Sequence, residues 1–124
     1  MTRIYTLVNQ KGGVGKTTTA INLGAYLAKL DQRVLIVDID PQANATSSLG
    51  VEKNSVSTST YDALLSGDVP ASSILFNERL QLSLLPSSPA LAGAEVELVE
   101  EEGREFRLRD ALESFKGKYD YILI

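Results

Sequence analysis

A glycine-rich segment near the N-terminus carries residue types that can hold a phosphate group. It reads Lys11-Gly12-Gly13-Val14-Gly15-Lys16-Thr17-Thr18 and lies between an expected strand and an expected helix. Glycines let successive backbone N–H groups turn toward one anion without a Cβ clash, and a helix N-terminus adds partial positive charge. Lys16 can reach the terminal phosphates, and the Thr17 hydroxyl can ligate Mg²⁺. The segment therefore predicts a polyphosphate site.

This loop departs at its first position from the usual phosphate-binding pattern, G-x-x-x-x-G-K-[ST]. Gln10 stands where that pattern has glycine, and Lys11 follows it. Lys11 would add a second fixed positive charge that stabilises a transferred phosphoryl group or reads a partner's nucleotide. The alternatives are a glycine-rich connector that binds nothing and, for Lys11 itself, a solvated loop lysine.

A second segment with chemical potential follows an apolar run and reads Asp38-Ile39-Asp40-Pro41-Gln42-Ala43-Asn44. It leaves the carboxyl end of an expected strand, where open α/β sheets bind ligands. Side-chain alternation would point Asp38 and Asp40 to the same side. Two carboxylates near Mg²⁺ and a γ-phosphate can orient water and hold hydrated metal. The alternative is a plain Asx-type turn in which Pro41 fixes the backbone.

Composition excludes several other chemistries. The chain has no Cys and no His, so disulfides, thiolate zinc sites and Ser-His-Asp triads are absent from it. Its formal charge of −4 is unevenly placed, with basic residues in excess over 1–38 and acidic residues in excess afterwards. This suits a small anionic ligand near the start better than a nucleic-acid surface along the whole chain. No apolar run approaches the roughly 20 residues of a membrane span, and the N-terminus lacks a signal-peptide layout, so we expect a cytoplasmic protein without a membrane partner.

Hydrophobic patterning predicts the elements that must position both segments. We expect strands over residues 3–8, 33–38, 80–85 and 119–124. We expect helices over 16–30, over 61–66 with Thr60 as N-cap, from Ser88-Pro89 through Val99, and over 104–115. The continuous run Val34-Leu35-Ile36-Val37 is typical of a strand buried on both faces of a parallel sheet. The element order predicts an α/β fold with a mostly parallel sheet in one domain.

These segments together resemble one known family. KGGVGKTT resembles the deviant Walker A motif of the ParA/Soj partition ATPases and their MinD-like relatives. VDIDPQANATSSLG at 37–50 resembles the ParA branch, because MinD-like proteins usually lack the Pro-Gln after the second Asp. TYDALLSGD at 60–68, LLPSSPALAGAEVEL at 84–98 and the final KYDYILI are also similar to that branch. The resemblance covers the whole chain.

The resemblance implies a three-layer P-loop NTPase of the SIMIBI type that uses ATP and Mg²⁺ and partitions chromosomes or plasmids. It implies a homodimer on ATP binding, a ParB-type centromere-binding partner and non-specific DNA binding on the nucleoid. The implied nucleotide contacts are Lys11, Gly12, Gly13, Val14, Gly15, Lys16, Thr17 and Thr18. Lys16 resembles the phosphate-gripping lysine, Thr17 the Mg²⁺ ligand, Thr18 a phosphate contact, and Lys11 the signature lysine that crosses the dimer interface. Asp40 resembles the residue that positions the hydrolytic water, and Asp38 a second-shell magnesium partner.

Family members run about twice this length, and their Walker B aspartate would follow Ile124. We therefore expect residues 1–124 to be the N-terminal part of a single P-loop ATPase domain, truncated at the Walker B strand. The closing apolar strand supports this expectation, because nothing after it would cover it. The adenine-contacting and DNA-binding residues would lie in the missing half. Two alternatives stay open: another MinD-like positioning ATPase, or a nucleotide-binding fragment without catalysis.

Overall fold

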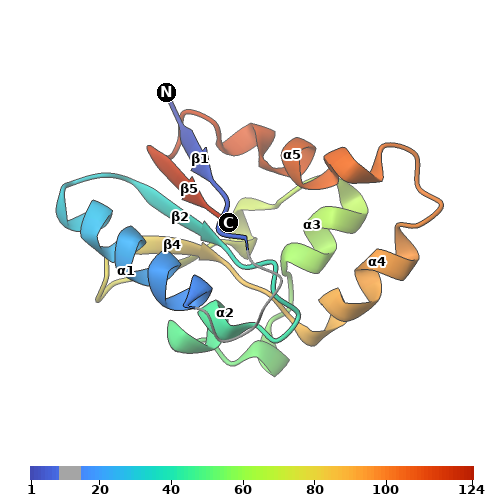
Figure 1. Ribbon diagram of the computed structural model, residues 1–124, viewed down its shortest axis with the longest axis horizontal. Helices are drawn as coiled ribbons and strands as arrows, with labels where there is room; N and C mark the ends of the chain where they lie inside the picture. The colour runs from blue at the N-terminus through green and yellow to red at the C-terminus, as the bar shows by residue number, and fades with distance from the viewer. Residues whose placement is uncertain (9–14) are drawn as a thin grey trace.

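The computed structural model describes residues 1–8 and 15–124 and has a five-stranded sheet at its centre (Figure 1). The strand order is β1-β5-β2-β4-β3, and only the β3–β4 pair is antiparallel. The carboxyl ends of the four parallel strands therefore meet at one edge of the sheet. The strands are β1 (Arg3–Tyr5), β2 (Val34–Val37), β3 (Leu75–Asn77), β4 (Leu82–Leu85) and β5 (Tyr121–Leu123).

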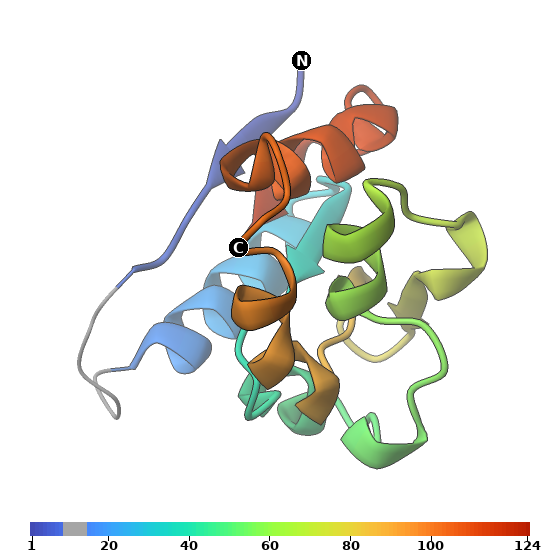
Figure 2. The same cartoon turned by 90° about the vertical axis from the view of Figure 1, so that its right-hand side faces the viewer.

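Helices cover both faces of this sheet. In the view of Figure 2, α1 and α3 lie on opposite sides of the strands. The α-helices are α1 (Lys16–Lys29), α2 (Asn44–Ser48), α3 (Thr60–Ser66), α4 (Ala94–Glu97) and α5 (Arg107–Leu112). Short 3₁₀ turns occupy Lys53–Ser55, Ala71–Ser73, Pro89–Gly93, Arg104–Phe106 and Glu113–Phe115.

Strand β2 separates two hydrophobic clusters, and each of its residues is at most 2% exposed. Val34 and Ile36 point into the cluster that includes residues of α1, whereas Leu35 and Val37 pack with residues of α3 and α5. This alternation explains why the run is apolar throughout, as its sequence indicated. The result is a three-layer α/β fold with a mostly parallel sheet, as predicted.

Helix α1 packs unusually close to the sheet at Gly24. A Cβ atom there would lie 3.3 Å from Ile36 Cδ1, 3.4 Å from Leu82 Cδ2 and 3.5 Å from Leu123 Cδ1. Those three side chains come from β2, β4 and β5, so the absence of a side chain lets the helix backbone approach three strands at once. This close approach fixes the height and direction of α1 over the sheet.

Several expected elements differ in extent. The four expected strands exist but are shorter, and the segments 89–99 and 104–115 divide into 3₁₀ turns and short α-helices. The N-cap of α3 is Ser59 rather than Thr60, because Ser59 accepts a hydrogen bond from the Tyr61 N–H and forms a capping box with Asp62. Strand β3 and helix α2 were not expected. β3 has only three residues and α2 is a polar run of five, so neither shows a hydrophobic periodicity.

The expectation that the closing strand would be uncovered is wrong. Strand β5 lies between β1 and β2, and its Ile122 and Leu123 side chains are fully buried. The two edge strands of the sheet are β1, whose three residues are all exposed, and β3. Patterning within one segment does not give strand order, so the insertion of the last strand beside the first was not visible in the sequence.

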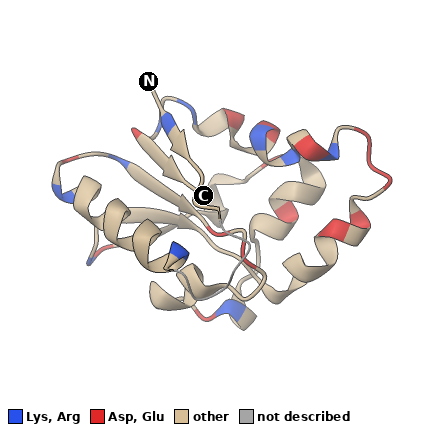
Figure 3. Cartoon of the chain, in the orientation of Figure 1, with Lys and Arg blue, Asp and Glu red and all other residues tan. Residues whose placement is uncertain are grey.

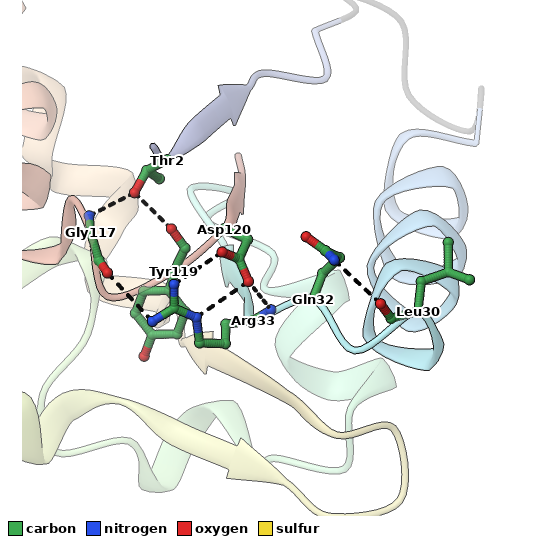
Figure 4. Close-up of polar contacts among 7 residues, drawn as sticks. All are labelled: Thr2, Leu30, Gln32, Arg33, Gly117, Tyr119 and Asp120. Atoms are coloured by element: carbon green, nitrogen blue, oxygen red, sulfur yellow. Dashed lines mark hydrogen bonds and ion pairs between the residues drawn. The ribbon is translucent and has the colours of Figure 1, made fainter.

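A polar cluster lies at the amino-terminal ends of the parallel strands β1, β2 and β5 (Figure 4). The Arg33 N–H donates to Asp120 Oδ2 at 2.7 Å, and Arg33 Nη2 donates to Asp120 Oδ1 at 3.0 Å. Thr2 Oγ1 donates to the Tyr119 carbonyl and accepts from the Gly117 N–H, each at 2.7 Å. The residues that precede β1, β2 and β5 are thereby tied together. Hydrogen bonds from Arg33 and its charge lower the pKa of Asp120 to about 2.

This lowered pKa predicts an acid-dependent contribution to stability. Because the pKa of Asp120 is below the unfolded value of about 3.9, its contribution is complete above that pH and is lost as pH falls toward 2. We expect Asp120→Asn to flatten the pH dependence of the unfolding free energy between pH 4 and 2, as measured by urea denaturation. The exposed Asp68→Asn variant is the control, and equal slopes for the wild type and Asp120→Asn would contradict the assignment.

Candidate functional site

A cavity of about 750 Å³ opens at the carboxyl edge of the parallel strands. Its walls come from the residues that follow β1, the first turn of α1, the turn after β2 and the end of β5. The structure thus brings together two segments that lie more than 20 residues apart in the sequence. The predicted site residues that line it are Gly15, Lys16, Thr17, Thr18, Asp38 and Asp40.

The first turn of α1 borders this cavity. Gly15 adopts a left-handed backbone with φ 88° as N-cap, no side chain caps the helix, and its first turn contains no acidic residue. The helix ladder starts with the Thr19 N–H donating to the Gly15 carbonyl at 2.8 Å. The N-terminal end of an α-helix carries partial positive charge, which favours an anion at this end of α1.

Part of the predicted phosphate loop lies outside the residues that the structure describes. This applies to Lys11, Gly12, Gly13 and Val14, so their expected roles stay predictions. Lys16 and Thr17 are half-buried at the cavity wall, and Thr18 is exposed there.

Asp38 is buried, with 4% of its surface exposed. Its Oδ2 accepts hydrogen bonds from Thr46 N at 2.9 Å and Thr46 Oγ1 at 2.7 Å, and its Oδ1 accepts one from Asp40 N at 3.0 Å. Burial raises the pKa of Asp38, although these three hydrogen bonds favour the ionised form. The carboxylate is therefore a fixed internal acceptor that shapes the turn.

Asp40 is half-exposed and lies beyond the end of β2, so strand alternation does not determine its direction. Its Oδ1 accepts from Gln42 N at 3.0 Å, and its Oδ2 accepts from Asn44 Nδ2 at 2.9 Å. Both Asp38 and Asp40 form Asx-type contacts to the N–H two residues on, and both line the cavity. The Asx turn, raised from the sequence as an alternative to a site, is here the structure that carries the candidate site.

A family model described as an AAA domain, AAA_31, matches residues 2–124. The chain is 53% identical over 123 residues to the chromosome partitioning protein ParA of Myxococcus xanthus, covering 98% of this chain and 43% of that protein. It is 52% identical over 124 residues to the sporulation initiation inhibitor protein Soj of Bacillus subtilis, covering 100% of this chain and 49% of that protein. The chain belongs to the AAA_31 family of ParA/Soj-type partition ATPases.

A solved structure of cobyrinic acid a,c-diamide synthase from Mycobacterium smegmatis, with bound ATP analog and magnesium, superposes on this ParA/Soj-type chain with a TM-score of 0.96. The two sequences are 40% identical, and the match covers 100% of this chain and 50% of that one. This agreement establishes the P-loop ATPase fold. The chain spans about half the length of these relatives.

Three site-forming residues of this ParA/Soj-type chain were missed by sequence reasoning: Thr46, Thr60 and Ser87. Thr46 Oγ1 accepts from Ser87 N at 2.9 Å, Ser87 Oγ donates to the Asp40 carbonyl at 2.6 Å, and Thr60 Oγ1 donates to the Asp38 carbonyl at 2.7 Å. All three side chains are fully buried. Ser and Thr are mostly exposed residue types, so their burial was not evident without the tertiary structure.

The side-chain oxygens at the cavity suit a hard cation that is held mainly by the phosphates of a bound nucleotide and by water. Within residues 1–8 and 15–124, no group of three or more His, Cys, Asp or Glu side chains is placed to hold a metal ion. The hydroxyl of Thr17 and the carboxylates of Asp38 and Asp40 border the same cavity. Mg²⁺ bound by one or two protein oxygens, phosphates and waters fits this set.

No helix in the described part of the chain is long and apolar enough to cross a membrane.

The buried contacts of Asp38 predict a stability effect. We expect Asp38→Asn to lower the unfolding free energy by about 1–3 kcal/mol. The amide NH₂ group would replace one of the two carboxylate oxygens, and a donor from Asp40 or Thr46 would then face another donor. Asp31→Asn is the control, since Asp31 is exposed and its positive φ of 61° suits Asn. Urea denaturation measures both, and equal stability of the two variants would contradict this role of Asp38.

Proposed function

We propose that this chain binds ATP and Mg²⁺ as part of an ATPase that partitions chromosomes or plasmids. The observation that carries the proposal is the meeting of the α1 first turn and the Asp38–Asp40 turn across one cavity. The 53% identity of this chain to a chromosome partitioning protein ParA supports a role in partition.

In this proposal, residues 11–18 surround the phosphates. Backbone N–H groups of Gly12, Gly13, Val14 and Gly15 and of the first helical turn would donate to phosphate oxygens. Lys16 would contact the β- and γ-phosphates, and Thr18 would add a hydroxyl contact. Thr17 would ligate Mg²⁺, and Asp38 would accept a hydrogen bond from water bound to that ion. When bound, Mg²⁺ neutralises charge on the phosphates.

Asp40 would act on the water that attacks the γ-phosphorus. Its half-exposed carboxylate borders the cavity opposite the first turn of α1. There it would accept a hydrogen bond from that water and orient it in line with the bond to ADP. Lys11 and Lys16 would stabilise the charge that develops on the phosphoryl oxygens. Lys11 would do so from the other copy of a homodimer that forms on ATP binding.

The proposed cellular role is cytoplasmic and nucleoid-associated, with a ParB-type centromere-binding protein as partner and non-specific DNA as surface. Figure 3 shows acidic residues along α4 and the loop after it, whereas α5 carries both signs, and the chain has a net charge of −4. Such a charge repels DNA phosphates. We therefore assign DNA contact to sequence outside these 124 residues, since the two relatives are about twice as long as this chain.

A second candidate function is that of a P-loop ATPase with the same fold but a role other than partition. The neighbour with TM-score 0.96 is named for cobyrinic acid amidation rather than for partition, and MinD-like positioning ATPases share the deviant loop. The identity to that neighbour is 40%, below the 53% and 52% to ParA and Soj, which favours partition. ATP-dependent binding of non-specific DNA by the complete gene product would support partition, and its absence would favour the second candidate or a fragment without catalysis.

Nucleotide binding is tested at Lys16. We expect Lys16→Ala to weaken Mg·ATP binding by about 100-fold in the complete gene product, because a charge-assisted contact to the phosphates is lost. Isothermal titration calorimetry measures the dissociation constant. Lys29→Ala, at the other end of α1, is the matched control and should bind as the wild type does. Unchanged affinity in Lys16→Ala would refute the assigned role.

Turnover is tested at Asp40. We expect Asp40→Ala to lower kcat for ATP hydrolysis by about 10²- to 10⁴-fold while Mg·ATP binding and dimerisation persist, because only the attacking water loses its orientation. Phosphate release and sedimentation measure these properties. The exposed Asp68→Ala variant is the control. Wild-type turnover in Asp40→Ala would remove Asp40 from the mechanism.

A further inference from the structure

We propose that Ser87 is a positioning residue for Asp40. The Ser87 hydroxyl would hold the backbone of Asp40 so that its carboxylate stays directed into the cavity. This inference rests on the proposed role of Asp40 in ATP hydrolysis and adds a residue from a different strand to it.

The backbone at Asp40 has few groups by which it can be held. The residue after it is Pro41, which has no N–H, so the carbonyl is the hydrogen-bonding group of the Asp40–Pro41 peptide unit. That carbonyl accepts from Ser87 Oγ at 2.6 Å and from Ala43 N at 2.8 Å. Ala43 belongs to the same turn and moves with it, whereas Ser87 follows β4. Ser87 therefore supplies a contact that holds the Asp40 backbone against a segment outside its own turn.

Ser87 is itself held rigidly. Its side chain is fully buried, and its N–H donates to Thr46 Oγ1 at 2.9 Å, while Thr46 Oγ1 donates to Asp38 Oδ2. The adjoining strands are also paired, with Asp38 N donating to the Leu85 carbonyl at 3.1 Å. The chain on both sides of Asp40 is thus anchored, at Asp38 through β2 and at its carbonyl through the segment after β4.

Buried polar groups concentrate at this place. Seven polar or charged residues are buried in the described part of the chain, and six of them join the hydrogen bonds between the turn after β2, the segment after β4 and the start of α3. The six are Asp38, Thr46, Ser59, Thr60, Ser87 and Ser88. The seventh, Ser73, has a buried hydroxyl without a hydrogen-bond partner among these residues, which makes it a matched control.

Ser87 is not among the described residues that line the cavity, so its loss removes no direct contact to nucleotide. We expect Ser87→Ala to lower kcat by about ten-fold, because a loosened Asp40 spends less time in the productive orientation. The dissociation constant of Mg·ATP should stay within about two-fold of the wild-type value. Ser73→Ala removes an equally buried hydroxyl and should change neither quantity.

The test measures kcat, Mg·ATP affinity and melting temperature for the complete gene product, its Ser87→Ala and Ser73→Ala variants, and Ser87→Ala combined with Asp40→Ala. If Ser87 acts through Asp40, the double variant hydrolyses ATP at the rate of Asp40→Ala alone. A purely structural Ser87 would lower that residual rate further, or would weaken affinity together with kcat, and either result overturns the proposal.

Two outcomes separate this inference from the proposed function. Hydrolysis by the wild type with an unchanged kcat in Ser87→Ala overturns the inference alone. A wild type that does not hydrolyse ATP overturns the proposed function, and the inference with it. If Ser87→Ala does not fold, Ser87→Cys replaces it, because a thiol fills the space with a slightly larger atom and donates more weakly; the same split between kcat and affinity is then expected, and its absence overturns the inference.

Discussion

The buried carboxylate of Asp38 is the interaction on which the rest of the site depends. Three hydrogen bonds converge on it from Asp40 and Thr46, so the chain that leaves β2 must fold back over its own end. An ionised group in such a place is costly unless its lone pairs are satisfied. Satisfying them determines the turn that carries Asp40, the start of α2 and, through the Thr46 hydroxyl, the segment after β4.

The close packing of α1 on the sheet supplies the other wall. Because Gly24 has no side chain, the backbone of α1 approaches Ile36, Leu82 and Leu123 on β2, β4 and β5. A helix so held keeps its uncapped first turn at the same sheet edge as the Asp38 turn. The two walls of the cavity are therefore positioned by separate contacts that share β2, whose four residues are buried on both faces.

The sequence predicted the elements that have strong periodicity or specific chemistry. Residues 16–29 and 34–37 have a long apolar stripe or an uninterrupted apolar run, and both elements are present. The start of the helix at 60–66 was also predicted, but its N-cap was placed one residue too late, at Thr60 instead of Ser59. What could not be predicted depends on tertiary contacts: the place of β5 inside the sheet, the burial of Thr46, Thr60 and Ser87, and the direction of Asp40 after β2 ends.

Two aspartates separated by one residue take different parts because their surroundings differ. A carboxylate has about four acceptor sites. Asp38 uses three of them on protein donors inside the fold, whereas Asp40 uses one on each oxygen and stays half-exposed at the cavity. Asp40 therefore keeps more acceptor capacity than Asp38, and both residues line the cavity. The buried aspartate therefore builds the turn, and the half-exposed one is the residue that we propose acts on what the cavity binds.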